Sequence, residues 1–284
     1  HKKLGSIGIL AAGATFGTTG TLQTLYAKDI SGLAIASTRL FVGAITLLIV
    51  ARFVTKKSTI RFPKSDLWMS GVGIAIYQLA FFCSVTLTGV PIATLTALGT
   101  SPIFTGIVAY LLVKEKPSRV WFKATLLTTI GITLLNTQPS DKGFNLFGVF
   151  LAALAGLGFA VFNVSSRRAL NAGIEPARLA AAVFSLAAVL VFPFCFVSGV
   201  HWITTVKGAS LILWLGVVAT GLGYTLYSYG LKRVHSSTAS TLVLAEPATA
   251  TLWSFASPQS VVQRRSETRR DRSAAAGRLR SLPP

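Results

Sequence analysis

The sequence predicts an all-α polytopic membrane protein built from two inverted five-helix repeats, with nine spans visible and a tenth expected. Of its 284 residues, 52% are hydrophobic and only 12% are charged, whereas an ordinary soluble domain carries about 25% charged residues. Apolar segments of about 20 residues recur along the chain, each long enough to cross a hydrocarbon core of roughly 30 Å as a helix. The third observation is an internal repeat.

The nine predicted spans follow one another with short connections. They cover residues 4–27, 30–54, 67–88, 91–113, 119–135, 147–166, 176–197, 209–231 and 236–255. The fourth begins directly after Gly89, because Pro91 is tolerated in a first helical turn, where its missing N–H would have no partner. The first span has no cleavage site after it, so we expect a retained helix rather than a signal peptide.

The distribution of Lys and Arg predicts how the chain is oriented. The connections after residues 27, 88, 135 and 197 hold Lys28, Lys142 and Lys207, whereas the N-terminus and the other connections hold many more basic residues. By the positive-inside rule the N-terminus lies in the cytoplasm. This pattern also accounts for the net charge of +19, so we predict no nucleic-acid partner.

The repeat divides the chain in two. Gly71 and Pro102 align with Gly216 and Pro247, each 145 positions later. We place a first repeat at 1–143, a second at 144–258, and an Arg-rich tail at 259–284. Each complete repeat would hold five helices, an odd number, so the two copies insert in opposite orientations, as in many secondary transporters.

The tail departs from this plan. Residues 259–284 lack an apolar run and read as disordered. Back-translation of residues 271–282 permits an apolar segment one base out of frame, so a shifted C-terminal reading frame would explain the missing tenth helix.

Several short motifs resemble one known family. They are Phe16 and Gly17, Arg39, YLLVKEKPS from Tyr110, SSRRAL from Ser165, and LAEP at 244–247. In order and spacing they resemble the drug/metabolite transporter superfamily, specifically its ten-helix EamA-type exporters. The chain is most similar to bacterial exporters of amino acids, including aromatic ones. The resemblance implies a multi-pass protein of the bacterial inner membrane that carries a small-molecule substrate.

Two charges lie deep inside predicted spans, where ionisable groups are costly and usually functional. Arg39 and Glu246 have matching depths, so they could pair. One interpretation is a pair that only fixes helix packing. The other is that Glu246 holds a substrate amino group or a proton, or that Arg39 holds a carboxylate.

The remaining candidates shape or line a binding site. Pro102 and Pro247 could kink their helices or act in gating, since each frees a carbonyl one turn back. The candidate lining combines aromatic and polar side chains; each of these residues could instead serve helix packing. They are Tyr77, Gln78, Phe81, Ser101, Asn163, Trp214, Tyr224 and Tyr227.

These features predict a secondary transporter that exports amino acids or related amphipathic metabolites by alternating access. We expect a monomer or weak dimer surrounded by membrane lipid, with no cofactor and no metal. No HExxH or P-loop pattern is present, and no nucleophile and base converge, so an enzyme is disfavoured. A membrane-embedded lipid-modifying enzyme and a passive channel remain the alternatives.

Overall fold

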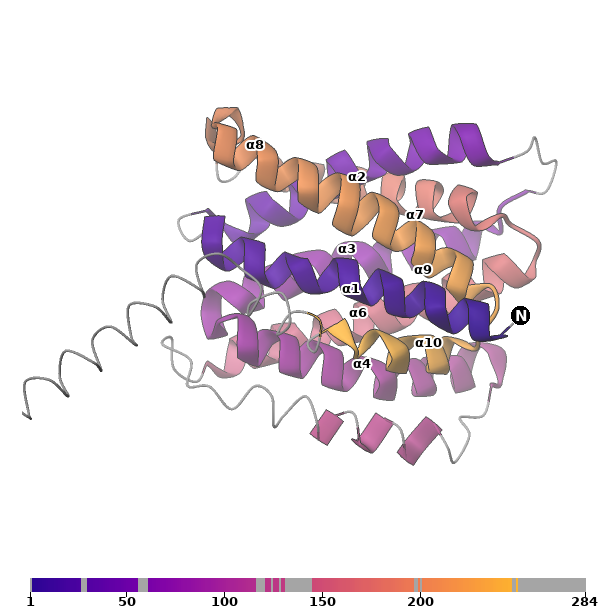
Figure 1. The fold of residues 1–284 in the computed structure, drawn as a ribbon. Coiled ribbons are helices and arrows are strands. Elements are labelled where there is room, and N and C mark those ends of the chain that lie inside the picture. The colour runs from indigo at the N-terminus through magenta and orange to yellow at the C-terminus, as the bar shows by residue number, and fades with distance from the viewer. Residues whose placement is uncertain are drawn as a thin grey trace, which may run out of the picture.

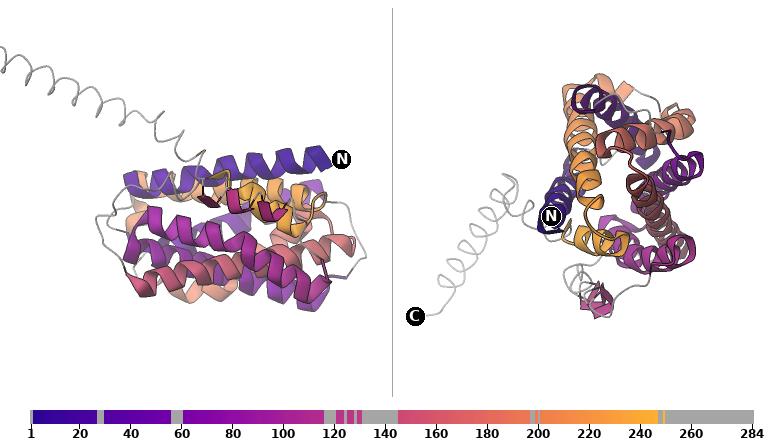
Figure 2. Two further views of the ribbon diagram at one scale, coloured as in Figure 1. Left: turned by 90° about the horizontal axis from the view of Figure 1, so that it is seen from below. Right: turned by 90° about the vertical axis from the view of Figure 1, so that its right-hand side faces the viewer.

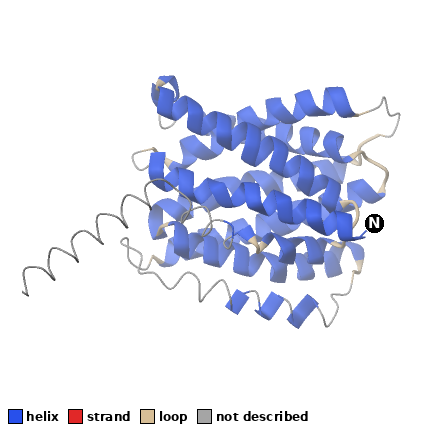
Figure 3. Ribbon diagram, in the orientation of Figure 1, coloured by secondary structure: helices blue, strands red, loops and turns tan. Residues whose placement is uncertain are grey.

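The protein is a bundle of long helices that run roughly along one axis (Figure 1). In this computed structural model, the described residues are 2–26, 30–55, 61–115, 121–123, 125–127, 129–130, 145–196, 199, 201–246 and 249. Every regular element within these ranges is helical (Figure 3). Seen end-on, the helices lie around a common centre (Figure 2).

The elements follow the predicted order. They are α1 (Lys2–Tyr26), α2 (Gly32–Val54), α3 (Lys64–Thr88), α4 (Val90–Val113), α6 (Leu146–Asn171), α7 (Pro176–Val191), the 3₁₀ turns η1 (Phe192–Cys195) and η2 (His201–Thr204), α8 (Val206–Leu213), the π-helix η3 (Trp214–Leu222), α9 (Gly223–Leu231) and α10 (Ser236–Val243). In the described part, six helical stretches are long and apolar enough to span a membrane. The prediction of an all-α polytopic membrane protein is confirmed.

The link between α3 and α4 is a single glycine. Gly89 has φ 82°, a left-handed conformation that favours glycine. Helix α4 follows at once with Pro91 in its first turn, as predicted, and it continues as one α-helix across Pro102. The tight link makes α3 and α4 antiparallel neighbours.

Three predicted spans are divided rather than continuous. The helix predicted over 176–197 changes to a 3₁₀ turn at Phe192, because Pro193 cannot donate a backbone hydrogen bond. The helix predicted over 209–231 contains the π-helix η3 in its middle. The helix predicted over 236–255 gives α10, which ends at Val243.

The end of α10 has a local cause in the sequence. A proline at 247 removes the donor that the carbonyl of Val243 would accept in an α-helix. Accordingly Leu244 and Ala245 donate to carbonyls three residues back, those of Thr241 and Leu242, at 3.1 and 3.2 Å. Pro247 itself lies outside the described residues, as do the tail at 259–284 and most of the span predicted at 119–135.

Glycines set the closest helix crossings. Gly73 on α3 and Gly158 on α6 pack backbone to backbone: a Cβ at Gly73 would lie 2.7 Å from the Gly158 carbonyl oxygen and 2.8 Å from the Phe162 nitrogen. Gly71 packs on Leu186 of α7, and Gly216, which the sequence aligns with it, packs on Val42 of α2. Both glycines thus let a branched apolar side chain of another helix approach the backbone.

The surface of the bundle suits lipid rather than water. Large apolar side chains are exposed, among them Phe53 at 84%, whereas Arg39, Gln78 and Asn163 are buried. Polar groups inside and apolar groups outside are the arrangement that a hydrocarbon surrounding favours.

We predict that Gly73→Ala destabilises the detergent-solubilised protein by about 1–3 kcal/mol, because the new methyl group meets backbone atoms that cannot rotate away. The measurement is thermal unfolding. Gly99→Ala is the matched control, since among the described residues a Cβ there meets only Thr129 Cγ2, at 3.6 Å. Equal stability of the two variants would contradict the backbone-to-backbone crossing.

Candidate functional site

Arg39 lies on α2 near the middle of the bundle and is only 5% exposed. Its Nε donates a hydrogen bond to Thr220 Oγ1, at 3.3 Å. Its guanidinium carbon lies 5.7 Å from the centroid of the Phe82 ring, a distance typical of a cation–π contact. A buried guanidinium has five N–H donors, so these contacts leave donors available for a further partner.

The π-helix η3 brings Thr220 to Arg39. Thr220 Oγ1 donates to the carbonyl of Leu215, five residues back, at 2.8 Å, and its lone pair then accepts from Arg39. Helix α2 can approach because Gly43 faces the Thr220 side chain, where a Cβ would overlap it. Short π-helical turns are frequent at functional sites.

Glu246 lies just beyond α10, next to α1. Its backbone nitrogen is 3.8 Å from the position that a Cβ would take at Gly13, and Thr249 Oγ1 donates to the Gly13 carbonyl at 3.3 Å. Arg39 and Glu246 interact electrostatically but do not form a direct ion pair; in the described part the recorded ion pair is Arg168–Asp66, at 3.3 Å. A buried arginine and a partly buried glutamate are therefore close enough to interact and are not directly bonded.

Rings from five helices pack together beside these charges. We call this group the aromatic cluster: Phe16, Tyr77, Phe81, Phe159, Phe162, Phe184, Tyr224 and Tyr227. Its shortest centroid distances are 4.3 Å for Phe184–Tyr224 and 4.7 Å for Phe16–Tyr224. Tyr77 and Tyr224 also interact electrostatically with both Arg39 and Glu246. The aromatic cluster thus borders the two charges.

Buried polar groups without a hydrogen-bond partner occur at the same place. Gln78 is 1% exposed and its Nε2 has no partner. Asn163 donates through Nδ2 to the Ser236 carbonyl at 3.2 Å, and its side chain also lies within hydrogen-bonding reach of the Tyr227 hydroxyl. Leaving such groups unpaired costs about 1–3 kcal/mol each, so they suit a bound polar molecule or water.

The structure brings most, not all, of the predicted site residues together. Trp214 is 42% exposed, donates to Thr18 Oγ1 at 3.0 Å, and makes no ring contact with the aromatic cluster. Ser101 is buried with an unpartnered Oγ and lies where α4 meets Gly156 of α6. Pro102 is buried within α4.

Sequence reasoning missed several residues. Thr220 looked like an ordinary helical threonine. The available signal was the set of three glycines around it, at 216, 221 and 223, of which Gly216 and Gly221 face α2. Phe82, Phe162 and Phe184 looked like any apolar residues of a span, and only the packing places them here.

One end of the bundle is tied by polar contacts; we call it the basic end, where Lys64, Lys114, Arg168 and Arg233 lie. Glu115, just after α4, accepts from Ser236 Oγ and Ser237 Oγ at 3.2 and 3.3 Å. Trp121 Nε1 donates to the Ser237 carbonyl at 3.0 Å. Asp66 pairs with Arg168 between α3 and α6. These contacts join the ends of helices from both halves of the chain.

The chain is similar to known transporters. The model of the EamA-like transporter family matches residues 3–137 and 146–260. The uncharacterized transporter YwfM of Bacillus subtilis (strain 168) is 32% identical over 87% of this chain and 83% of its own. The uncharacterized transporter YoaV of the same organism is 26% identical, over 85% and 84%. The biotin transporter of Escherichia coli (strain K12) is 26% identical over 57% of this chain and 54% of its own.

A solved crystal structure has the same fold. It matches 89% of this chain and 87% of its own with a TM-score of 0.73 and 19% identity. At this identity the likeness shows the fold alone.

We predict that Thr220→Val lowers the free energy of unfolding by about 1.5–3 kcal/mol, because it keeps the shape of threonine and removes the hydroxyl that Arg39 uses. Thr220→Ser is the control, since it keeps the hydroxyl and loses one methyl group, worth about 1 kcal/mol. Thermal unfolding of both variants checks this. A Ser variant that is less stable than the Val variant would show that packing, not the hydrogen bond, matters at this position.

Proposed function

Since this chain belongs to the EamA-like transporter family, we propose that it is a secondary transporter that exports amino acids with apolar or aromatic side chains. The substrate lies between Arg39 and Glu246 with its side chain against the aromatic cluster. Export proceeds across the bacterial inner membrane, with the N-terminus in the cytoplasm.

The observation that supports this proposal is the separation of the buried Arg39 from the partly buried Glu246. If their role were only structural, a direct ion pair would satisfy both, because each remains costly in hydrocarbon without a partner. Instead they interact without a direct bond. An amino acid carries the complementary groups: its carboxylate fits the free N–H donors of Arg39, and its ammonium fits the carboxylate of Glu246.

The aromatic cluster fits the rest of such a substrate. Tyr77 and Tyr224 belong to the cluster and also interact electrostatically with both charges, so the cluster and the charges together suit an amphipathic molecule. Stacking of one ring on another contributes of order 1 kcal/mol. An apolar or aromatic side chain therefore adds affinity that a polar one would not.

Alternating access would use the two repeats as moving halves. The contacts at the basic end, from Glu115 to Ser236 and Ser237, join the halves and close that end. In this scheme they break when the protein opens to the cytoplasm, and the substrate gradient or a proton on Glu246 supplies the energy.

A second candidate is a substrate with a carboxylate and no ammonium, which the similarity to biotin transporters favours. Such a substrate would use Arg39 and the aromatic cluster and leave Glu246 without a ligand. Transport that depends on Arg39 and not on Glu246 would favour it over an amino acid.

We predict that Arg39→Met and Glu246→Gln each reduce counterflow uptake of phenylalanine into proteoliposomes roughly tenfold or more, the factor that corresponds to losing about 1.4 kcal/mol of binding. Arg52→Gln is the matched control for charge loss on α2, because Arg52 lies at the exposed end of that helix.

Wild-type uptake by both Arg39→Met and Glu246→Gln would overturn the proposed site. An unchanged pH dependence and substrate range in Glu246→Gln would exclude this residue from proton coupling.

A further inference from the structure

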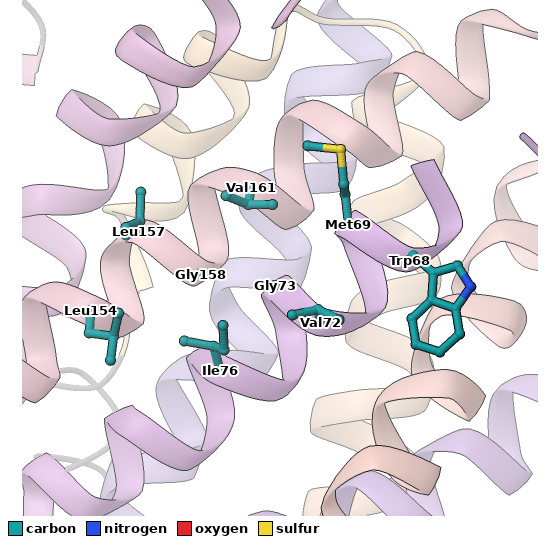
Figure 4. A pocket seen from close by; sticks show the side chains of 9 residues that line it. All are labelled: Trp68, Met69, Val72, Gly73, Ile76, Leu154, Leu157, Gly158 and Val161. Carbon is teal, nitrogen blue, oxygen red and sulfur yellow. The ribbon is translucent and has the colours of Figure 1, made fainter. Parts of the chain in front are cut away.

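A groove on the outside of the bundle lies opposite the aromatic cluster. It runs between α3 and α6 and has a volume of about 390 Å³. Figure 4 shows its walls, formed by Trp68, Val72 and Ile76 of α3 and by Leu154, Leu157 and Val161 of α6. Every wall residue is apolar or aromatic, so the groove is suited to a hydrocarbon ligand.

The floor of the groove is the glycine crossing. Gly73 and Gly158 have no side chains, and each would place a Cβ against the backbone of the other helix. The absence of side chains makes the surface concave at this point. The groove is open to lipid, because it lies on the face of α3 where the side chains of Trp68, Val72 and Ile76 are exposed.

A cation, Lys64, lies on α3 one helical turn beyond Trp68, a residue of the groove wall. Lys64, Trp68, Val72 and Ile76 are four residues apart in sequence and therefore share one face of α3. Lys64 is exposed at the first residue of the helix. The nearby carboxylate of Asp66 is turned to Arg168, at 3.3 Å, so it does not neutralise Lys64. Along this face the charged Lys64 comes first, the amphipathic ring of Trp68 follows, and two apolar side chains come last.

From these features we propose that the groove binds one acyl chain of an anionic membrane phospholipid, with the phosphate at Lys64. The distance from Trp68 to Ile76 is about 12 Å along the helix, close to half of a hydrocarbon core of roughly 30 Å. The groove thus fits a chain from a single leaflet. Trp68 lies at the level where tryptophans contact lipid headgroups, and Lys64 lies one turn further toward water.

A lipid fits better than a second copy of this chain. Lys64 lies one helical turn beyond the groove wall, whereas a parallel second copy would bring another basic end close to this lysine. Anionic headgroups attract such a cation by about 1 kcal/mol per residue.

Bound lipid would affect the candidate site indirectly, through the backbone crossing of α3 and α6. A Cβ at Gly158 would lie 2.8 Å from the nitrogen of Tyr77, and one at Gly73 would lie 2.8 Å from that of Phe162. Both residues belong to the aromatic cluster, so the groove and the cluster lie on opposite faces of the same two turns. The lipid thereby supports the spacing of α3 and α6 on which the cluster depends.

The test is native mass spectrometry of the full chain taken from bilayers of equimolar phosphatidylglycerol and phosphatidylcholine with identical acyl chains. The wild-type protein is expected to retain one phosphatidylglycerol in preference to phosphatidylcholine. Val72→Trp fills the groove and is expected to lose this retained lipid. Leu10→Trp is the control, because Leu10 on α1 is 41% exposed and Val72 is 38% exposed.

Lys64→Gln distinguishes the contribution of the lipid headgroup from that of the acyl chain, because it removes the cation and changes only an exposed side chain. It is expected to keep a lipid while its preference for phosphatidylglycerol falls roughly fivefold, the factor that corresponds to about 1 kcal/mol.

Three results would overturn the proposal: undiminished retention in Val72→Trp, equal retention of both lipids by the wild-type protein, or a protein dimer that Val72→Trp dissociates. The last would make the groove an interface between copies of the chain.

Discussion

The charge of Arg39 is the constraint on which the interior of this protein depends. A guanidinium stays protonated in proteins, and in a membrane span it is tolerated only with polar or aromatic partners around it. Those partners come from separate elements: Thr220 from the π-helix, Phe82 from α3, and Glu246 from the segment after α10. The π-helix and the segment after α10 depart from a regular α-helix, and α3 is held in place by its close packing on α6.

Glycines allow these elements to meet. Gly43 makes room for Thr220, and the Gly73–Gly158 crossing holds the helices that carry Tyr77 and Phe162. In a membrane, close backbone packing replaces the hydrophobic effect as a source of helix association. The same small residues that bring the helices together on the inside leave a groove on the lipid side, so the site and the groove have a common origin.

The fold was predictable because its signals are local or periodic. Apolar segments of span length and the helix start after Gly89 follow from composition and from the chemistry of single residues, and α1 to α4, α6 and α7 appear in the predicted order. The continuity of the later spans was wrong. The π-helix packs against α2 through Gly216 and Gly221, and glycines in a span do not by themselves distinguish a π-helix from an α-helix.

The candidate site was predictable only in part. Arg39 and Glu246 stand out because charges are rare inside spans, and the structure places them near each other. Their lack of a direct bond depends on distances that a sequence does not specify. Trp214 shares the chemistry of the aromatic cluster but faces Thr18 and the bundle surface, since residue type alone does not determine which way a ring points. Thr220 was missed because its importance comes from its hydrogen bond with Arg39, and a sequence does not show that these two residues are neighbours.

The most direct test of this account compares three competitors that share one phenyl ring. Phenylalanine has both charges, phenethylamine has only the ammonium, and 3-phenylpropionate has only the carboxylate. If Arg39 and Glu246 each bind one end of the substrate, phenylalanine inhibits transport by the wild-type protein at concentrations at least tenfold lower than either analogue, about 1.4 kcal/mol of binding. Equal inhibition by phenylalanine and by either single-charge analogue would contradict the account.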